Sequence, residues 1–520
     1  MDLASILFAL SGVLFLLILH KLVVNPSNGK NKPLQIPEIP GGLPFIGHLH
    51  LLGGEDTLAR KLASFADKHG SMFTIRLGAY PTVVVSDFES MKDCFVKNDR
   101  ALAARPPSTQ GKILGNNFAV FGFASYGEYW RNVKKLIITE IMSLPRIRAL
   151  RHVQVSEVDV LIRDLHLQCS SSQQADHEVV VISDWLQNFV LNIITRMVAG
   201  KKYFENLADS RPVGELIREF MDVNGSLVLS DLIPILGWID IKGMKKAMRR
   251  ISKELDVIVD GWIDEHKVKR NKLGDNLVPE DFIDVMLSVV DDNFDPSSKH
   301  DKETIIKSTA MAVIIAAADT TSVTLTWMLS NLLNNRRAMA ALKQEIDEKV
   351  GFDRIVEDSD LENLTYLHAV IRETLRMNPA GPISVPRVAS EDITIRGYHV
   401  PKGTRFFANF WKLHRNPEMF PEPDEFRPER FHEKEVKVDI YGRDFEYLPF
   451  GTGRRSCPGM NFGMQVVQLT AARLIQAFDF GTPFDLPVDM TEADSTTLAK
   501  AKPLEVVLTP RLSPELYRQA

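Results

Sequence analysis

The chain has 520 residues, of which 45% are hydrophobic and 25% charged, with a formal net charge of −5 at pH 7. These are ordinary values for a globular protein, and the scattered basic residues give no indication of a nucleic-acid partner. The three cysteines, Cys94, Cys169 and Cys457, lie far apart, which argues against a disulfide framework and favours a reducing compartment. Cys94 is expected in the core and Cys169 at the surface.

Residues 1–24 are predicted to form a membrane anchor. The stretch from Leu3 to Leu19 carries no charged residue, and with the residues after it the segment approaches the roughly 20 apolar residues that cross a bilayer. A cleaved signal peptide is the alternative, but Asp2 stands where a basic residue is expected, and no clear cleavage site precedes Asn25. Because the nearby cations follow the segment, the rest of the chain is expected in the cytosol.

Residues 25–50 are predicted to form a polar linker and a proline-rich hinge. The prolines between Pro33 and Pro44 restrict the backbone and stiffen the exit from the membrane. Residues 51–520 are expected to form one catalytic domain, because helical periodicity prevails there and no internal repeat appears.

Short strands are predicted at a few places in this otherwise helical domain. Met72 to Leu77 and Thr82 to Val85 form a predicted β-hairpin. Further strand-like pieces lie at Ile393 to Ile395 and near Leu504 to Leu508. The predicted fold class is therefore mostly α with a small β-sheet portion.

An apolar segment from Leu227 to Trp238 is followed by several cations between Lys242 and Arg250. Apolar side chains backed by cations can enter an anionic membrane interface. Burial in the protein core explains the same pattern, and the sequence leaves both interpretations open.

An acid–alcohol pair, Asp319 and Thr320, stands inside the apolar helical run from Met311 to Trp327. Buried polar groups cost about 1–3 kcal/mol unless they are paired, so the pair needs an explanation. One explanation is structural, because a threonine hydroxyl can bond to the i−4 carbonyl and bend the helix. The other is a role in chemistry beside the helix.

Glu373 and Arg376 are at positions i and i+3 of the helical run from Leu364 to Met377, where a carboxylate and a guanidinium can pair. Such pairs are common on exposed helices, so the signal is weak alone. It gains weight from the downstream motif Phe426 to Phe431, which contains Arg430.

The most informative stretch is Phe450 to Gly459, with the pattern F-x-x-G-x-R-x-C-x-G. It places Cys457 two residues after Arg455 and just before the helical run from Met460 to Phe478. A thiolate at the start of a helix is stabilised by the helix dipole and by free backbone N–H groups. This environment suits a haem iron held by one cysteine sulfur, which favours O–O cleavage. A buried structural cysteine is the alternative.

On this pattern the chain resembles the cytochrome P450 family of haem-thiolate monooxygenases. Phe410 to Pro417 and Lys502 to Leu512 are similar to plant microsomal hydroxylases that oxidise flavonoids, coumarins, alkaloids and terpenoids. The resemblance implies the cytochrome P450 fold after a single transmembrane helix, and haem b as the cofactor. It also implies an endoplasmic reticulum location, with membrane lipid as a contact.

The resemblance assigns Cys457 as the iron ligand and places Phe450 in the same haem-binding loop. The other implied haem-binding residues, several of them expected at the propionates, are Arg455, Arg387, Trp130 and Lys134. The family usually has arginine where Lys134 stands, so this chain keeps the charge but loses the planar fork.

The resemblance also implies that Asp319 and Thr320 relay protons for cleavage of the O–O bond. Ala317 stands where many relatives have glycine, which implies a slightly narrower groove for oxygen. The implied network that would fix the cysteine loop consists of Glu373, Arg376 and Arg430.

The implied reaction is hydroxylation of a small, largely apolar plant metabolite with O2 and two electrons. Because no Gly-rich dinucleotide fingerprint follows a strand, NADPH is expected to act only through a separate NADPH–cytochrome P450 reductase. A haem-thiolate rearrangement or dehydration catalyst is one alternative, and the Asp319–Thr320 pair argues against it. A haem-based sensor is another, but no output domain is visible in the sequence.

The resemblance indicates which segments line a substrate pocket without identifying the substrate. These are Arg105 to Phe123, Leu227 to Leu236, Ala312 to Ala316, Ala380 to Val385 and Ala493 to Leu498.

Overall fold

The computed structural model describes residues 11–12, 33–171, 179–204, 212–226, 228–233, 240, 243–274, 278–291, 294–295, 299–433 and 435–519. Of the predicted anchor, residues 1–24, only residues 11–12 are described, and they are helical. The rest of the anchor and residues 25–32 of the predicted linker lie outside the described residues.

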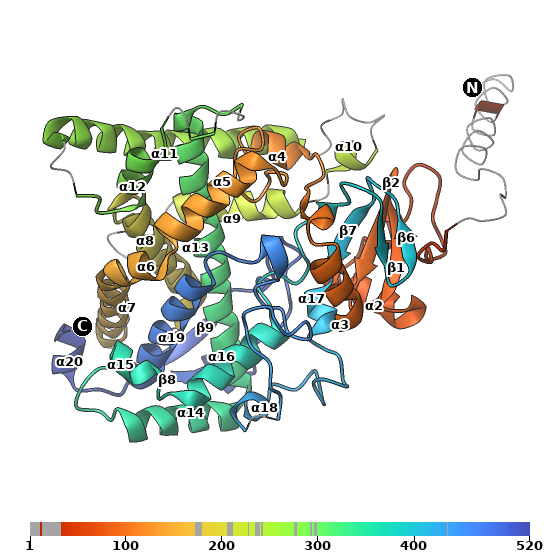
Figure 1. Ribbon diagram of the computed structural model, residues 1–520. Helices are drawn as coiled ribbons and strands as arrows, with labels where there is room; N and C mark the ends of the chain where they lie inside the picture. The colour runs from red at the N-terminus through yellow and green to blue at the C-terminus, as the bar shows by residue number, and fades with distance from the viewer. Residues whose placement is uncertain are drawn as a thin grey trace, which may run out of the picture.

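Helices make up most of the described chain (Figure 1). The α-helices are α2 (Leu58–His69), α3 (Phe88–Lys92), α4 (Thr109–Ile113), α5 (Glu128–Leu136), α6 (Leu144–Ala149), α7 (Arg151–Ser171), α8 (Ile182–Ala199), α9 (Pro212–Gly225), α10 (Leu229–Leu232), α11 (Met244–Leu273), α12 (Phe282–Val289), α13 (Lys302–Asn334), α14 (Arg336–Lys349), α15 (Asp358–Leu361), α16 (Thr365–Met377), α17 (Phe410–Leu413), α18 (Glu429–His432), α19 (Met460–Ala477) and α20 (Pro514–Gln519). Shorter helical turns are the 3₁₀ segments η1 (Leu49–Leu51), η3 (Ala101–Ala103), η8 (Gly453–Arg455) and η9 (Pro483–Asp485), and the π segments η2 (Asp93–Lys97) and η4 (Ile137–Ile141).

The strands form small sheets, of which the largest lies at one end of the molecule (Figure 1). They are β1 (Met72–Leu77), β2 (Tyr80–Val85), β3 (Val179–Val181), β4 (Arg387–Val388), β5 (Ile393–Ile395), β6 (Tyr398–Val400), β7 (Arg405–Ala408), β8 (Phe478–Gly481) and β9 (Glu505–Pro510). The sheet orders are β1-β2-β7-β4, β3-β9-β8 and β5-β6.

The predicted hairpin is confirmed as the antiparallel pair β1 and β2, in which Met72 faces Val85. β2 begins at Tyr80, two residues before the predicted start, because the turn is tighter than expected. β2 also pairs in parallel with β7, so that Thr82 faces Arg405. This parallel pairing joins segments more than 300 residues apart and brings β7 to the cavity described below.

The proline-rich segment runs along the outside of this sheet. The backbone N–H of Thr74 donates to Pro37 at 2.8 Å, and that of Ile39 donates to Thr74 at 3.1 Å. The described part of the predicted hinge, residues 33–50, is therefore hydrogen-bonded to the catalytic domain.

Helix α13 runs through the middle of the molecule (Figure 1). It contacts α8, α11, α16 and α19, and Asp301 caps its first turn by accepting a hydrogen bond from the Thr304 N–H at 2.8 Å. Among the described residues it is the one helix apolar and long enough to cross a membrane, but 72% of its most apolar window is buried in the protein. A helix that is apolar on all sides and covered by other helices is a core helix.

The apolar segment after α9 is buried where the structure describes it. Val228, Leu232 and Ile233 are each less than 9% exposed, and Leu232 accepts a hydrogen bond from the Ala79 N–H at 2.9 Å. These contacts support the core interpretation for residues 228–233. Residues 227 and 234–239 of the segment lie outside the described residues.

A carboxylate ties this segment to the neighbouring loop. Both oxygens of Asp231, on α10, accept hydrogen bonds from Thr109, one from its backbone N–H and one from its hydroxyl, each at 2.6 Å. Gln110 donates to the Ser226 carbonyl at 2.9 Å. The start of α4 and the region of α10 are therefore held together.

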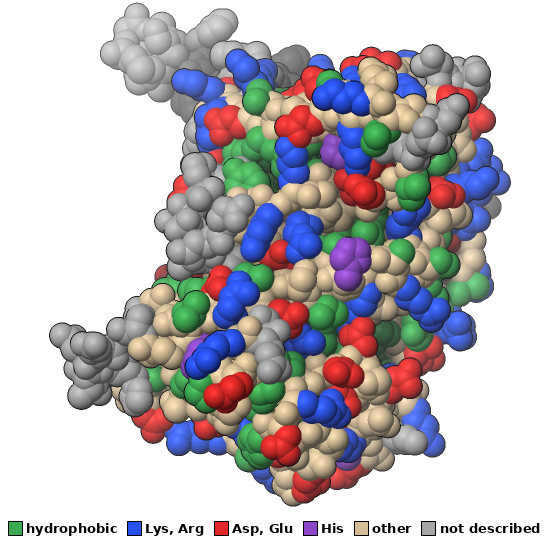
Figure 2. All heavy atoms as spheres, turned by 90° about the vertical axis from the view of Figure 1, so that its left-hand side faces the viewer, with side chains coloured by type: hydrophobic (Ala, Val, Ile, Leu, Met, Phe, Trp, Pro, Cys, Tyr) green, Lys and Arg blue, Asp and Glu red, His purple; other side chains and the backbone are tan. Residues whose placement is uncertain are grey.

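The cysteines and the surface charges agree with most of the sequence expectations. All three cysteines are free; Cys94 is buried as predicted, whereas Cys169 is half-buried against the main core rather than a fully exposed thiol. On the face shown in Figure 2, Lys and Arg side chains are interspersed with Asp and Glu.

Candidate active site

A cavity of about 1180 Å³ lies beside α13 and is lined mainly by apolar side chains. Its wall includes parts of every segment that was expected to line a substrate pocket. Those parts fall within residues 105–123, 228–232, 312–316, 380–385 and 493–498. Because the segments are far apart in the sequence, tertiary packing creates the cavity.

Cys457 faces this cavity from the loop between η8 and α19. Its side chain is exposed there, and its backbone N–H donates to the Phe450 carbonyl at 3.0 Å. Burial within the molecule raises the pKa of the Cys457 thiol, and a hydrogen bond from the Gly459 backbone partly opposes the rise. Such a thiol loses its proton most readily when a metal ion binds the sulfur, because metal binding requires the thiolate.

The loop before Cys457 depends on a glycine. Gly453 has a left-handed backbone (φ 69°), and a Cβ atom on it would lie 2.4 Å from Oδ1 of Asp99. Asp99 accepts hydrogen bonds from the Arg454 backbone N–H at 3.1 Å and from its Nη1 at 2.7 Å. The absence of a side chain at Gly453 therefore lets Asp99 hold the loop.

Three guanidinium groups, those of Arg105, Arg387 and Arg455, line the same cavity. Arg455 donates to the carbonyl oxygens of Ala103 and Ala124 at 2.8 and 2.6 Å, and none of the three forms an ion pair with a described carboxylate. Burial lowers the pKa of Arg387 to about 10 and that of Arg455 to about 9, and the charge of Arg387 adds to the effect on Arg455. A bound anion would relieve this repulsion.

Arg387 is buried and has guanidinium nitrogens without a hydrogen-bond partner among the described residues. It is 4% exposed and lies over the ring of Phe95, with its Cζ 4.7 Å from the ring centroid. Its Nε and Nη1 are buried and have no hydrogen-bond partner in the described part of the chain. Because a buried unpaired donor costs about 1–3 kcal/mol, this site is suited to a bound acceptor.

Trp130, on α5, packs behind Arg455, whose Cζ lies 4.6 Å from the indole centroid. The indole stacks on Phe121, and its Nε1 is buried without a partner among the described residues. Lys134, one turn later, lies 5.1 Å from the Trp130 ring and donates to the Arg454 carbonyl oxygen. Trp130 and Lys134 therefore lie next to the cavity wall, which Arg455 forms.

Asp319 and Thr320 point to different surroundings. Thr320 lines the cavity beside Ala317, and its hydroxyl donates to the Ala316 carbonyl at 2.8 Å. Asp319 is 8% exposed and is not part of the cavity wall. Burial raises the pKa of Asp319, and the nearby Thr497 hydroxyl opposes the rise. The i−4 bond expected on structural grounds is thus present, and the hydroxyl is in the cavity as well.

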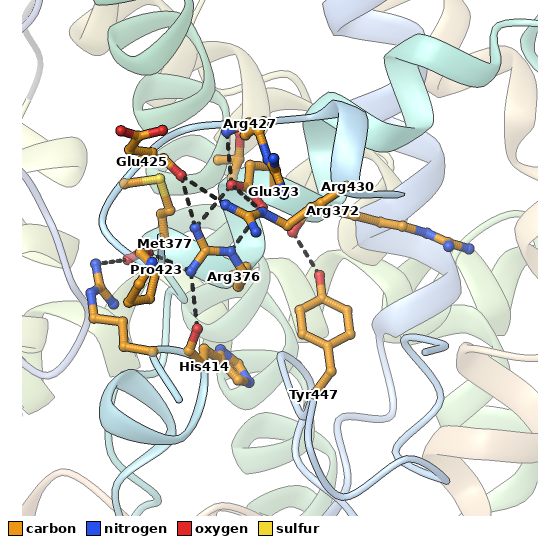
Figure 3. Close-up of polar contacts among 12 residues, drawn as sticks. Arg372, Glu373, Arg376, Met377, His414, Pro423, Glu425, Arg427, Arg430 and Tyr447 are labelled. Carbon is orange, nitrogen blue, oxygen red and sulfur yellow. Dashed lines mark hydrogen bonds and ion pairs between the residues drawn. The ribbon is translucent and has the colours of Figure 1, made fainter. Parts of the chain in front are cut away.

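The predicted Glu–Arg–Arg network forms in the core (Figure 3). Glu373 accepts bonds from Arg376 at 2.8 and 2.9 Å and from Arg430 at 3.1 Å, and all three side chains are 0% exposed. Arg376 also donates to the carbonyl oxygens of His414 and Pro423 at 3.0 and 2.7 Å. The buried charges are therefore paired and satisfied by hydrogen bonds.

His414 carries this network to the cysteine loop. Its Nε2 accepts a hydrogen bond from the Leu448 backbone N–H at 2.9 Å, and Tyr447 donates to the Arg372 carbonyl at 2.8 Å. Burial, with the charges of Arg376 and Arg415, lowers the pKa of His414 to about 3. The neutral ring accepts the bond that fixes the chain before Cys457.

Comparison with known proteins agrees with this geometry. The family model described as "Cytochrome P450" matches residues 37–508. The chain belongs to the cytochrome P450 family. It is 47% identical to cytochrome P450 CYP82J17 of Trigonella foenum-graecum, over 95% of each chain. It is 45% identical to xanthotoxin 5-hydroxylase CYP82C4 of Arabidopsis thaliana, over 94% of this chain and 95% of that one. It is 41% identical to nicotine N-demethylase CYP82E3 of Nicotiana tomentosiformis, over 97% and 98%.

This cytochrome P450 is a monooxygenase that uses haem iron and takes electrons from a reductase. The cavity fits haem, which presents an iron and two carboxylates to a largely apolar site. The thiol of Cys457 faces the cavity, and the unpaired donors of Arg387 together with Arg105 and Arg455 suit the carboxylates. The donor set and the cofactor therefore match.

Arg105 was not expected from the sequence to join Arg387 and Arg455 as a candidate haem-binding residue of this P450. Its Nη1 donates to the carbonyl oxygens of Val385 and Pro386, each at 2.8 Å. Burial lowers the pKa of Arg105, and the charges of Arg455 and Arg387 lower it further. A signal was present, because Arg105 is a lone charge after the apolar run Ala101 to Ala104.

Proposed function

We propose that this P450 hydroxylates a small, largely apolar plant specialised metabolite of the flavonoid, coumarin, alkaloid or terpenoid class. The observation that carries the proposal is the apolar cavity of about 1180 Å³ that contains both Cys457 and Thr320. Ligand sites usually enclose about 300–1,000 Å³, so the cavity has room for a cofactor and a small substrate. Two of the relatives are named as a xanthotoxin 5-hydroxylase and a nicotine N-demethylase, which supports the substrate range.

In the proposed site, the Cys457 sulfur ligates the haem iron, and Phe450 packs in the same loop. When bound, haem supplies the dioxygen and electron-transfer chemistry. The guanidinium groups of Arg105, Arg387 and Arg455 pair with its propionates, which would satisfy the buried donors of Arg387. Each of these pairs is a charge-assisted hydrogen bond in a dry site, where it is strong.

Trp130 and Lys134 take supporting parts in this proposal. The indole N–H of Trp130 is unpaired and can donate to a propionate. The Lys134 ammonium donates to the Arg454 carbonyl and lies over Trp130. We therefore expect Lys134 to act on the propionates indirectly, through its contacts with Arg454 and Trp130. An arginine could keep these contacts and also pair with a propionate, because its guanidinium has several donors in one plane, whereas the lysine ammonium lacks this planar fork.

Thr320 and Asp319 are proposed to supply protons during turnover. The Thr320 hydroxyl donates a hydrogen bond to the Ala316 carbonyl. The lone pairs of Oγ1 therefore stay available to accept a hydrogen bond from a water molecule in the cavity. Asp319 lies beside it on α13 and has a raised pKa because it is buried. A carboxyl group with a raised pKa is better suited to take up and release protons than an ordinary ionised carboxylate.

The remaining proposals concern the membrane. Residues 1–24 would anchor the chain in the endoplasmic reticulum membrane, residues 25–50 would link it, and residues 51–520 would face the cytosol. An NADPH–cytochrome P450 reductase in the same membrane would supply the electrons. The apolar character of Leu3 to Leu19 supports this arrangement.

The full chain, expressed in microsomes with a plant reductase, tests the proposal. The microsomes are incubated with NADPH, ¹⁸O-labelled dioxygen and a panel containing xanthotoxin, nicotine, a flavonoid and a terpenoid. We expect at least one compound to gain one labelled oxygen atom, and a Cys457→Ala control to form no product. Products from the whole panel without label, or product formation without a reductase, would refute the proposal.

A further inference from the structure

A buried cluster of one histidine and two aspartates lies outside the active site, where α12 contacts both α8 and α11 (Figure 1). His266 belongs to α11, Asp284 belongs to α12, and Asp281 immediately precedes α12. All three side chains are buried, and each offers a ligand atom that lies within 4.8 Å of the others. None of the three lines the active-site cavity.

The imidazole of His266 makes a short contact through each ring nitrogen. Its Nδ1 lies 2.6 Å from the Trp262 carbonyl oxygen, which can only accept a hydrogen bond, so Nδ1 carries a hydrogen. Its Nε2 lies 2.8 Å from Oδ2 of Asp281. In the neutral ring, Nε2 is then an acceptor that faces a second acceptor. These two atoms must therefore share a positive species, which is either a further proton or a metal ion.

Asp284 favours the metal ion over the proton. Its side chain is 0% exposed, and Oδ2 accepts hydrogen bonds from the Glu280 backbone N–H and from Lys269, each at 3.2 Å. Oδ1 is buried and has no hydrogen-bond partner among the described residues. A proton on His266 satisfies Asp281 but leaves this oxygen unpaired, which is costly in a buried site. A cation shared by the three side chains satisfies it as well.

Asp281 is held so that one of its oxygens faces the cluster. Oδ1 caps α12 by accepting a hydrogen bond from the Asp284 backbone N–H at 2.9 Å, which leaves Oδ2 beside His266. A Cβ atom on Gly200, the residue that ends α8, would lie 3.1 Å from this Oδ2. The end of α8 therefore lies close to the cluster, and the partial negative charge of a helix C-terminus adds to the attraction for a cation.

We propose that His266, Asp281 and Asp284 bind one divalent metal ion, with Zn²⁺ as the preferred ion. An imidazole nitrogen together with carboxylate oxygens is a donor set that suits Zn²⁺, whereas Mg²⁺ prefers oxygen ligands. Two ligand atoms that are each about 2.1 Å from one ion lie about 3.0–3.4 Å apart. His266 and Asp281 therefore need to separate by only a few tenths of an ångström. The bond from Nδ1 to the Trp262 carbonyl is of the kind that orients a metal-binding histidine.

The charges around the cluster balance a divalent ion. The two aspartates supply two negative charges when His266 is neutral. Lys269 also bonds to Glu280 at 2.7 Å, so these two charges compensate each other, and both side chains reach solvent, which screens them. The ion would thus join α11 to α12 without leaving a net charge in the core, and its role would be to stabilise the fold.

The full-length, haem-loaded enzyme tests this site with ZnCl₂ as the probe. The protein is treated with EDTA and desalted, and zinc bound per haem is then measured by equilibrium dialysis, together with the thermal midpoint. Asp284→Asn keeps the shape of the side chain and an acceptor for the Glu280 N–H but removes the charge, and His266→Gln removes the ring. His399→Gln is the matched control, because His399 lies 3.8 Å from one carboxylate, that of Asp392, and outside the cluster.

Wild type and His399→Gln should bind one zinc ion per haem and gain a few degrees in thermal midpoint, while MgCl₂ at the same concentration should have no effect. The reduced-CO spectrum should stay normal, which shows that Cys457 does not take up the zinc. Loss of a partner outside the ligand set already weakens metal binding about 10–100-fold, so Asp284→Asn and His266→Gln should each bind zinc at least about tenfold more weakly. Equal zinc affinity in wild type and both variants would overturn the proposal. So would an unchanged wild-type midpoint, which would mean that a proton holds His266 and Asp281 together.

A second measurement needs no variant. Anomalous diffraction at the zinc absorption edge, from wild-type crystals grown with ZnCl₂, locates the ion directly. A peak about 2.0–2.2 Å from the nearest atoms of His266, Asp281 and Asp284 supports the site. Peaks only at other positions, or no peak, would contradict it.

Discussion

Leu448 donates its backbone N–H to Nε2 of His414 at 2.9 Å, and this bond joins a buried ionic network to the loop that presents Cys457. The carbonyl oxygen of the same histidine accepts a bond from Arg376. One residue, His414, therefore bonds both to Arg376 in the core and to the chain segment that precedes Cys457.

Replacing Arg376 with alanine should destabilise the protein and prevent haem incorporation. It leaves Glu373 buried with only Arg430 as an ionic partner, and breaking a buried pair typically costs about 3–5 kcal/mol. The reduced-CO difference spectrum and the thermal midpoint measure the effect. Arg354→Ala is the control, because its pair with Asp360 is partly exposed and should contribute below about 1 kcal/mol. A normal spectrum for Arg376→Ala would contradict the structural role.

Replacing His414 with glutamine should make stability less sensitive to acid. The pKa of His414 falls from 6.5 in the unfolded chain to about 3 in the folded protein. Because its folded pKa is lowered, the unfolded state binds the proton first, and the stability contributed above pH 6.5 is lost as the pH falls toward 3. Glutamine has no such titration.

Thermal midpoints of the wild type and His414→Gln between pH 4 and pH 8 check this expectation. The wild-type midpoint should fall more steeply than the His414→Gln midpoint as the pH falls. Parallel curves over the whole range would mean that His414 is not a buried neutral ring.

Replacing Arg387 with methionine should act in opposite directions on the two forms of the protein. In the haem-free chain it removes buried unpaired donors, which is expected to stabilise the fold by about 1–3 kcal/mol. In the loaded enzyme it removes a donor that we propose pairs with a propionate, so haem should dissociate faster. Thermal unfolding of the haem-free chain and haem transfer to apomyoglobin give the two readouts.

The exposed Arg443 provides the control for this pair of measurements. Arg443→Met should change neither readout. A loss of stability in haem-free Arg387→Met would show that its guanidinium is satisfied within the protein.

Replacing Thr320 with valine should uncouple turnover while haem stays bound. The variant keeps the shape of the side chain but removes the hydroxyl that lines the cavity, so less product and more hydrogen peroxide should form per NADPH. Thr324→Ser keeps a hydroxyl one turn later, where Thr324 donates to the Thr320 carbonyl at 2.8 Å, and serves as a conservative comparison. Unchanged coupling in Thr320→Val would rule out the relay.

Replacing Asp231 with alanine should loosen one side of the cavity. It removes both 2.6 Å bonds to Thr109, which hold α10 against the start of α4. Imidazole, used as a haem-ligand probe in stopped-flow absorbance, should bind and dissociate several-fold faster, with little change in the equilibrium constant. Arg405 donates only to the Asp231 carbonyl there, at 3.2 Å, so this backbone contact survives. Unchanged rates would mean that ligands reach the haem by another side.

The local patterns were sufficient to locate the cysteine loop and the principal helices. The pattern around Cys457, with Gly451, Gly453 and Arg455, depends on neighbours in the chain, and the structure confirms the loop. The predicted β-hairpin and the helix with Glu373 and Arg376 were also correct, because periodicity and turn residues act over a few positions. The apolar run from Met311 to Trp327 covers only the middle of α13, because polar residues toward both ends of the helix interrupt the apolar pattern.

Other assignments required the packing of distant segments. Arg105 joins Arg387 and Arg455 because separate parts of the chain meet at one cavity wall. Lys134 bonds to the Arg454 carbonyl, a contact that no spacing in the sequence indicates. Contacts between such distant residues depend on how the helices and loops pack together.

The sequence by itself therefore determined the family and the class of reaction, because these follow from residues that act as a local motif. Only the tertiary structure decided that Thr320 lines the cavity while Asp319 is buried outside its wall. The two residues are adjacent in the chain, but successive side chains on a helix point about 100° apart. Their neighbours are thus set by the elements that surround α13, which the local sequence does not contain.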